Sequence, residues 1–252
     1  MRRTHVRIVL VLSVIVSVLA IATPRAQRGY GGYSQSYSGN VRYDGKFVFI
    51  RLSYPWYGGR GAPWAHDWPR GEEHFLKIFN EMTATPVHVA ESSIMGLSDP
   101  ELFKFPVAYM AEPGFWSMGD AETRALRDYL MKGGFMIMDD FRGRDWGNVE
   151  LNVSKMFPEG RWVDLDASHA IFHSFFEINT LDIIPQAYDA GRPIFRALFE
   201  DNDPNKRIMI IAAYNTDMSE FWEWSDTGYA PVPVSNEAYK IGINLFIYGL
   251  TH

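Results

Sequence analysis

Two adjacent aspartates, Asp139 and Asp140, occupy the position in this chain that most clearly suggests chemistry. They follow residues 135–138, an apolar run without alternation, which is typical of a parallel strand covered on both faces. Because open α/β sheets bind ligands beyond the carboxyl ends of their strands, we expect this pair at a ligand site. A carboxylate there can hold a cation, bind a hydroxyl group or transfer a proton. The structural alternative is a helix cap, or a salt bridge to Arg142 or Arg144.

Side chains alternate along a strand, so Asp139 and Asp140 are expected to point to opposite faces and not into one cleft. A third carboxylate, Glu112, follows another apolar run at residues 106–111. Glu112 can serve as a catalytic acid or base. Its alternative role is to accept backbone hydrogen bonds in the turn at Pro113.

Two histidines, His169 and His173, are four residues apart. On a helical turn they would share a face and could bind one metal, with Asp164 and Asp166 adding oxygen ligands. The spacing matches no complete metal signature, so we predict no metal site and no cofactor. We expect His169 instead to be a hydrogen-bonding residue that orients a ligand, and a candidate catalytic group with Glu112 and Asp139.

Aromatic side chains gather in two segments, a long loop after the first expected strand and residues 221–224, which we also expect to be a loop. Tryptophan and tyrosine beside charged residues suit sugars or peptide side chains, since they combine flat apolar contact with polar groups. The alternative is that they pack the loops onto the core or form a protein interface. The predicted ligand-binding residues are Tyr54, Trp56, Trp64, Trp68, Asp140, Arg142 and Trp222.

Apolar periodicity predicts the elements that position these residues. Expected strands cover 46–53, 87–89, 106–111, 135–138, 161–165, 194–199 and 208–214. Expected helices begin after Pro69, at a cap formed by Ser117, near Val149 and at a cap formed by Ser235. This order predicts an α/β three-layer sandwich with a mostly parallel sheet and a late antiparallel hairpin.

Several segments in fixed order resemble one bacterial family across nearly all of residues 45–252. They are FVFIRLSY, SDPELFKFP, LRDYLMKGGFMIMDDF, MFPEG, DASHAIFHSFF and KIGINLFIYGLTH. The chain is identified as a member of the family called domain of unknown function 4159, which implies no established activity. That family is similar to the class I glutamine amidotransferase-like and trehalose-utilisation-like proteins, which implies a flavodoxin-like sandwich. The position of the amidotransferase cysteine corresponds here to the turn containing Glu112, and the chain has no cysteine, so glutamine hydrolysis by that mechanism is not expected.

The amino terminus predicts export. Basic residues precede an apolar run that ends in small residues at 20–22, as in a signal peptide, and no cysteine follows for lipid attachment. We expect a cleaved signal at 1–22, a flexible Gly/Ser/Tyr-rich tether at 23–44 and one domain at 45–252, with no membrane span after cleavage. The net charge of -6 becomes more negative without the three arginines of the signal, which argues against nucleic acid as a partner.

Two functions follow from these residues. We predict a periplasmic or secreted, noncatalytic binding or assembly module whose partner is a carbohydrate or an envelope protein. The evidence is the missing cysteine, the lack of a complete catalytic motif and an aromatic content of 15%. The alternative is a carbohydrate-active hydrolase, lyase or isomerase that uses Glu112, Asp139 and His169.

Overall fold

The computed structural model describes residues 39–56, 61–182, 184 and 191–252. The expected signal peptide and most of the expected tether lie outside the described residues. In the described ranges, no helix is both long enough and apolar enough to cross a membrane. All the elements given below belong to one compact unit, Gly39–His252.

Seven strands of the described chain form one sheet in the order β2-β1-β3-β4-β7-β6-β5. Their bounds are β1 Phe47–Ser53, β2 Val87–Gly96, β3 Val107–Ala111, β4 Phe135–Phe141, β5 Trp162–Leu165, β6 Ile194–Phe199 and β7 Ile208–Tyr214. The first five strands in this order are parallel, whereas β6 is antiparallel to both β7 and β5. This confirms the expected mostly parallel sheet with a late antiparallel hairpin.

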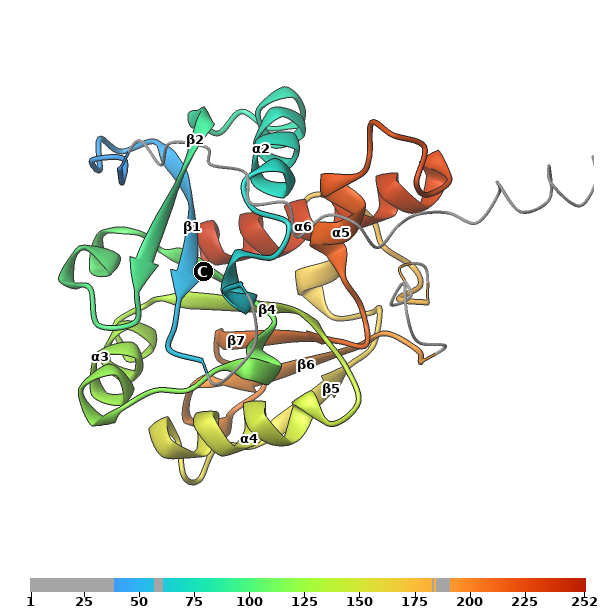
Figure 1. Ribbon diagram of the computed structural model, residues 1–252. Coiled ribbons are helices and arrows are strands. Elements are labelled where there is room, and N and C mark those ends of the chain that lie inside the picture. The colour runs from blue at the N-terminus through green and yellow to red at the C-terminus, as the bar shows by residue number, and fades with distance from the viewer. Residues whose placement is uncertain (1–38, 57–60, 183, 185–190) are drawn as a thin grey trace, which may run out of the picture. The chain divides into compact units, whose positions relative to one another are not determined.

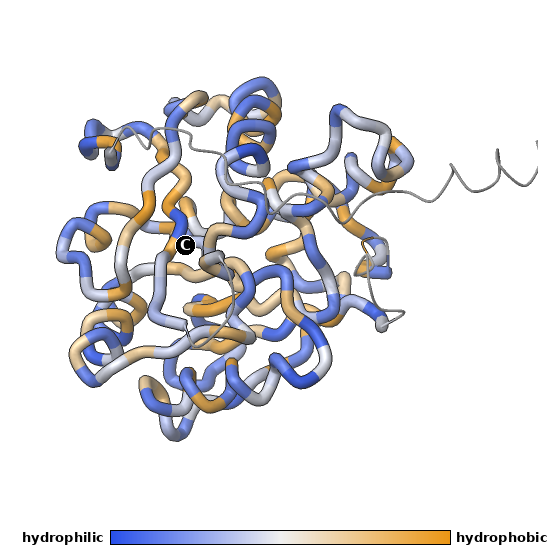
Figure 2. Tube along the Cα trace, in the orientation of Figure 1, coloured by the Kyte–Doolittle hydropathy of each residue, from blue (hydrophilic) through white to orange (hydrophobic). Residues whose placement is uncertain are grey.

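Helices cover both faces of the sheet, as a three-layer sandwich requires (Figure 1). The α-helices are α2 Arg70–Met82, α3 Asp120–Met131, α4 Asp145–Met156, α5 Met218–Glu223 and α6 Val232–Thr251. Helices α2, α5 and α6 pack on one face and α3 and α4 on the other, which gives two separate hydrophobic cores. Hydrophobic and hydrophilic residues alternate along α2, α3 and α4 in Figure 2, as expected for helices with one buried side.

The centre of the sheet follows directly from the sequence. All seven residues of β4 are buried, and the strand lies between β3 and β7, which explains the absence of alternation in its apolar run. Gly133 has the left-handed backbone, with φ 111°, that ends α3 before β4 begins. The strand therefore delivers its last residues to the carboxyl edge of the sheet.

Several expected boundaries are wrong. Helix α3 begins after Gly119, whose N–H is bound by the Glu122 side chain at 2.8 Å, and Ser117 instead donates to the carbonyl of Pro55. Helix α6 begins at Val232 with Pro231 as its N-cap residue and no side-chain cap, and Pro233 in the first turn has no N–H that needs a partner. The second strand is longer than expected, since it pairs with β1 as far as Gly96.

The segment 221–224, expected to be a loop, forms the end of α5 and the turn after it. Trp222 is only 1% exposed and its ring lies 4.6 Å from that of Phe75. A side chain at Gly242 of α6 would come within 2.6 Å of the Trp222 ring, so α6 approaches α5 closely there. Trp222 is therefore part of the hydrophobic core rather than a contact surface.

Candidate functional site

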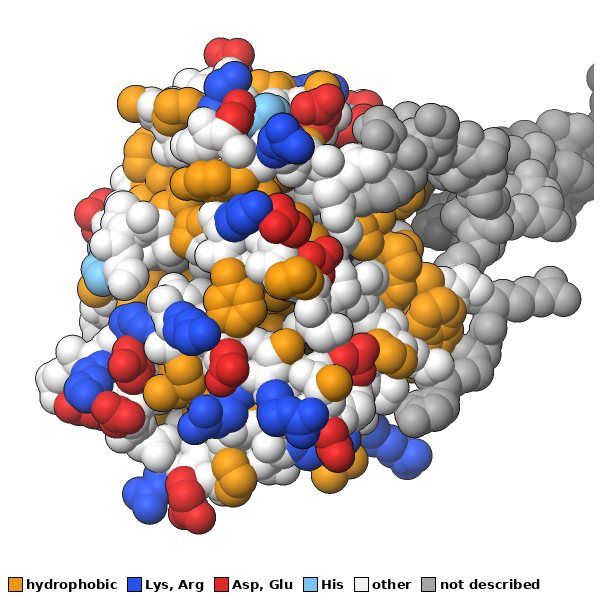
Figure 3. Space-filling model, turned by 90° about the vertical axis from the view of Figure 1, so that its left-hand side faces the viewer, with side chains coloured by type: hydrophobic (Ala, Val, Ile, Leu, Met, Phe, Trp, Pro, Cys, Tyr) orange, Lys and Arg blue, Asp and Glu red, His pale blue; other side chains and the backbone are white. Residues whose placement is uncertain are grey.

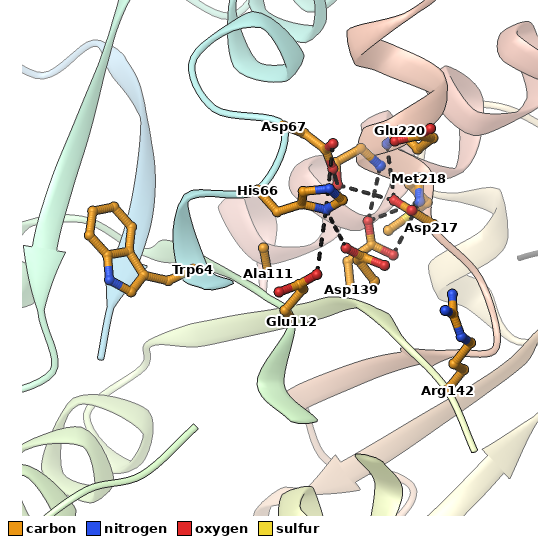
Figure 4. Close-up of polar contacts among 12 residues, drawn as sticks. Trp64, His66, Asp67, Ala111, Glu112, Asp139, Arg142, Asp217, Met218 and Glu220 are labelled. Carbon is orange, nitrogen blue, oxygen red and sulfur yellow. Dashed lines mark hydrogen bonds and ion pairs between the residues drawn. The ribbon is translucent and has the colours of Figure 1, made fainter. Parts of the chain in front are cut away.

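The carboxyl ends of β1, β3, β4 and β7 meet at one edge of the sheet. One histidine and six acids come together there, and we name them the strand-end cluster (Figure 4). The cluster consists of His66 and Asp67 after β1, Glu112 after β3, Asp139 and Asp140 in the last part of β4, and Asp217 and Glu220 after β7. The chain order reverses between β1 and β3, which is where doubly wound sheets bind ligands.

His66 connects the acids of the cluster. Its Nδ1 atom hydrogen-bonds Oδ2 of Asp140 at 2.7 Å. The same nitrogen lies 3.6 Å from a carboxylate oxygen of Asp67 and 3.6 Å from one of Glu112. The side chains of His66 and Glu112 are 27% and 17% exposed, so a ligand can reach this part of the cluster from solvent.

Residues of β1 and of the segment after it hold His66 and Glu112, the two partly exposed members of the cluster, in place. The buried guanidinium of Arg51 pairs with Glu72 of α2 and donates to the carbonyl of Trp64 at 2.8 Å, which fixes the loop carrying His66. The hydroxyl of Tyr54 donates to the carbonyl of Glu112 at 2.6 Å. Arg51 of β1 and Tyr54, which directly follows β1, thus hold the backbone segments that carry His66 and Glu112.

Three acids of the cluster have a left-handed backbone, with φ of 60° at Asp67, 46° at Glu112 and 56° at Asp140. Residues other than glycine rarely adopt this conformation, and such strain concentrates at functional sites. At Asp140 it interrupts the regular strand, and the pairing of β4 with β7 shifts register between Met138 and Phe141. The expectation that Asp139 and Asp140 point to opposite faces is wrong for this reason, since both carboxylates reach the same cluster.

Asp139 lies deepest and fixes α5. Its Oδ2 atom accepts a hydrogen bond from the Tyr109 hydroxyl at 2.7 Å. The backbone N–H groups of Met218 and Ser219 donate to the same carboxylate at 3.0 and 3.1 Å. Asp139 therefore has the alternative role expected for one of the two aspartates, that of a helix cap. The helix it caps is α5, which follows β7 and not β4.

Asp217 forms the local cap of α5. Its Oδ1 atom accepts from the N–H of Glu220 at 3.0 Å, and the Ser219 hydroxyl donates to Asp67 at 2.6 Å. Asp217 is 0% exposed, and its Oδ2 atom has no hydrogen-bond partner among the described residues. A buried carboxylate oxygen without a partner is unusual because its desolvation is not compensated.

Burial and mutual repulsion shift the ionisation of these groups. Burial, followed by the charge of Asp140, raises the pKa of Glu112 to about 8. Burial also raises the pKa of Asp139 to about 7, although the Tyr109 hydroxyl opposes this. Burial alone would lower the pKa of His66, but the hydrogen bond to Asp140 and the surrounding carboxylates raise it to about 10. Glu112 and Asp139 can therefore hold or release protons near neutral pH, whereas His66 stays protonated there and can act as an acid.

The cluster also has the composition of a cation site. Three sets of side chains in the described ranges have ligand atoms within 4.8 Å of one another. They are His66, Glu112 and Asp140; His66, Asp67 and Glu220; and Asp67, Asp140 and Asp217. The arrangement can therefore transfer protons, bind a cation or do both.

The sequence analysis named Glu112, Asp139 and Asp140, and the structure brings these three together. Trp64 lies on the β1 side of His66 (Figure 4) and Trp68 is two residues beyond it, both half-buried. Among the other predicted ligand-binding residues, Tyr54 is buried beneath Glu112, and Trp56 is 37% exposed with its backbone bridged to Trp116. Arg142 lies to one side of the cluster in Figure 4.

His169 does not join Glu112 and Asp139. It begins the short 3-10 helix η4 (Ala170–His173), where its Nδ1 atom accepts from the N–H of Ile171 at 3.2 Å. Its ring lies 5.9 Å from that of Phe199, which is paired with the first residue of β7, whereas the cluster lies beyond the last. His173 bonds Glu177 and the carbonyl of Ala167, so the two rings are engaged separately and share no ligand position.

The sequence analysis missed His66, Asp67, Asp217 and Glu220 as site residues. A signal was present for Asp217, which follows the buried strand β7 as Asp139 and Asp140 follow apolar residues of β4. His66 and Asp67 lie in the aromatic loop that follows the first strand. The types of these residues are ordinary for loops, and only their convergence marks them.

The family model described as "Domain of unknown function (DUF4159)" matches residues 48–250. No curated protein matches the chain.

Proposed function

The chain belongs to the DUF4159 family, whose description names no activity, and from the geometry of the strand-end cluster we propose an enzyme that transfers protons on a carbohydrate. The observation that supports it most is the contact of one partly exposed imidazole with two carboxylates from different strands. Nδ1 of His66 lies 2.7 Å from Asp140 and 3.6 Å from Glu112. A histidine oriented by one carboxylate beside a second one is a typical acid–base arrangement.

In this proposal each residue has a distinct role. Asp140 orients the imidazole, and His66 and Glu112 exchange protons with a bound hydroxyl group or ring oxygen. Asp139 positions α5 and does not touch the substrate, because it is fully buried and bonded to Tyr109. Half-buried Trp64 and Trp68, two residues before and two residues after His66 in the chain, are of the type that packs on the apolar face of a sugar ring. Hydrolysis, elimination and isomerisation all use such proton transfers.

The test compares two histidine variants of the whole chain. Purified protein is incubated with a panel of sugars and glycosides, and products are followed by NMR. We expect His66→Ala and Glu112→Gln to lose at least about a hundredfold in turnover, the usual contribution of acid–base catalysis. His169→Ala is the matched control and should keep turnover, since that ring packs on Phe199. Equal turnover in His66→Ala and wild type would overturn the proposal.

A noncatalytic binding or assembly module is the second candidate. Exposed aromatic side chains favour it, since Trp56 is 37% and Phe115 is 49% exposed and the backbones of Trp56 and Trp116 are bridged. In a thermal-shift screen with the same sugars, a module would show stabilisation that Trp56→Ala removes and His66→Ala leaves intact, without any turnover.

Export to the periplasm or the exterior and an envelope partner are part of this proposal. They are supported by the basic and apolar amino terminus and by the net charge of -6. The face toward the left of Figure 1 mixes acidic, basic and apolar side chains (Figure 3), which gives a polyanion no extended basic surface there. Amino-terminal sequencing of the protein recovered from the periplasm would test cleavage after residue 22.

A further inference from the structure

The inner part of the strand-end cluster is a triad of aspartates from three segments. Asp67 follows η1 (Pro63–Ala65), Asp140 belongs to β4 and Asp217 precedes α5. Each offers a carboxylate oxygen, and these oxygens lie within 4.8 Å of one another. The three residues are 5%, 7% and 0% exposed. Three carboxylates are therefore held close together almost out of contact with water.

An independent observation shows that the protein's own contacts leave this triad incomplete. The Oδ2 atom of Asp217 is buried and has no hydrogen-bond partner among the described residues. The charged groups that act on Asp217 most strongly are acids, with Asp140 and Asp67 foremost. An unpartnered anionic oxygen among like charges is costly unless a cation or a proton compensates it.

The geometry and the donor atoms favour one class of cation. Hard divalent cations hold oxygen ligands at about 2.0–2.6 Å, so two ligands of the same ion lie at most about 5 Å apart. The spacing within the triad satisfies this limit. An all-carboxylate donor set suits Mg²⁺, Ca²⁺ or Mn²⁺, whereas Zn²⁺ and Cu²⁺ favour sites with imidazole or thiolate.

We propose that Asp67, Asp140 and Asp217 bind one hard divalent cation in the inner part of the strand-end cluster. The site goes beyond the proposed acid–base chemistry, since it uses the buried oxygens and needs no sugar to form. Asp140 belongs to both sites, because it also contacts His66. The bound cation would fix the loop after β1 against the start of α5, which are joined already through Ser219 and Asp67.

Shared protons are the competing explanation, because closely spaced carboxylates can also remain neutral. Asp217→Asn separates the two. Its side-chain oxygen can keep the cap on the N–H of Glu220, for which asparagine is as good a residue as aspartate. The change removes the charge and replaces the unpartnered oxygen by an NH2 group, which donates hydrogen bonds and cannot bind a cation. Asp166→Asn is the matched control, since Asp166 lies in an exposed turn and accepts hydrogen bonds from Ser168.

The whole chain is freed of metal with EDTA, dialysed, and titrated with Mn²⁺ by calorimetry and electron paramagnetic resonance. We expect wild type and Asp166→Asn to bind one Mn²⁺ per chain, and Asp217→Asn to bind it at least about tenfold more weakly. In EDTA the Asp217→Asn variant should melt at the same temperature as wild type or higher, because a buried like charge is gone. Asp67→Asn provides a second reading if Asp217→Asn does not fold.

Unchanged Mn²⁺ affinity in Asp217→Asn would overturn the site. So would the absence of any uptake of Mn²⁺, Mg²⁺ or Ca²⁺ by wild type at millimolar concentration, or uptake of Zn²⁺ alone. The sugar turnover of His66→Ala is measured separately, so failure of the cation site and failure of the proposed function give different results.

Discussion

The strand-end cluster and the η4 segment, residues 166–177, contain the same kinds of side chains in opposite circumstances. In the η4 segment, the hydrogen bonds from Ser168 hold the pKa of Asp166 below its usual range. His173 pairs with Glu177, whose side chain is 76% exposed. In the cluster the carboxylates are buried or half-buried, and burial raises the pKa of Glu112 and Asp139.

The histidines show the same contrast. Burial lowers the pKa of His169, which contacts a phenylalanine ring and has only one nearby acid to oppose the effect. His66 is also partly buried, yet its carboxylate neighbours raise its pKa to about 10. In the η4 segment, each charged group pairs with a residue close to it in sequence. In the cluster, acids from the ends of four strands lie close together, with one histidine among them. The concentration of like charges is therefore what distinguishes the ionisation of the cluster from that of the η4 segment.

The largest effect that tests this comparison is expected from Asp139→Ala. It removes the acceptor of the Tyr109 hydroxyl and of two N–H groups of α5. We expect a loss of about 3 kcal/mol or more in the free energy of unfolding, because each buried donor left without a partner costs about 1–3 kcal/mol. Urea denaturation measures it. Asp166→Ala should shift the midpoint little, and an equal shift for both variants would contradict the contrast.

A pH series on the metal-free protein is expected to give the next largest effect. The folded-state pKa is raised at Glu112, to about 8, and at His66, to about 10. Each group therefore contributes stability that is present below its unfolded pKa and is lost as the pH rises through the folded value. We expect the melting temperature to fall from about pH 4.5, the ordinary pKa of a glutamate, to about pH 10, the raised pKa of His66. Asp166 acts in the other direction, with stability lost only as the pH falls through its lowered pKa. A melting temperature that rises toward alkaline pH would contradict the raised folded-state pKa values of Glu112 and His66.

The smallest effect should come from Glu112→Gln. This change removes one acid from beside Asp140 and should raise the melting temperature at pH 9 by about 2–4 °C, as about 1 kcal/mol does in a domain of this size. Differential scanning calorimetry in EDTA measures it. Glu177→Gln is the control in the η4 segment and should leave the melting temperature unchanged. A lower melting temperature for Glu112→Gln would mean that its carboxylate is stabilising.

Much of the fold could be predicted because burial leaves a pattern in the chain. The unalternating run before Asp139 predicts a central strand, and β4 is buried throughout. The strand-end position of Glu112, Asp139 and Asp140 follows from the rule on parallel sheets. Helix starts were less accurate, because Gly119 and Pro231 replace the expected serine caps. Trp222 was misjudged because a short aromatic helix and an aromatic loop have the same composition.

The partners within the site could not be predicted in the same way. His169 and His66 are both histidines beside acids and aromatic residues, and nothing local distinguishes them. The position of His66 depends on Arg51 and Glu72, which hold the loop after β1 from a strand and a helix. Asp140 reaches the cluster because its own backbone is left-handed, whereas the alternation of side chains holds only for a regular extended strand.

By itself the sequence determined the layered α/β architecture, the central strand and the edge where acids gather, since hydrophobic periodicity and chain direction are written along the chain. Only the tertiary structure decided which histidine meets those acids and that Asp67, Asp140 and Asp217 face one another. These contacts join segments far apart in the chain, as in the bond from Ser219 to Asp67, which are 152 residues apart. Such contacts depend on loop paths and strand register, and those are fixed by packing rather than by local preference.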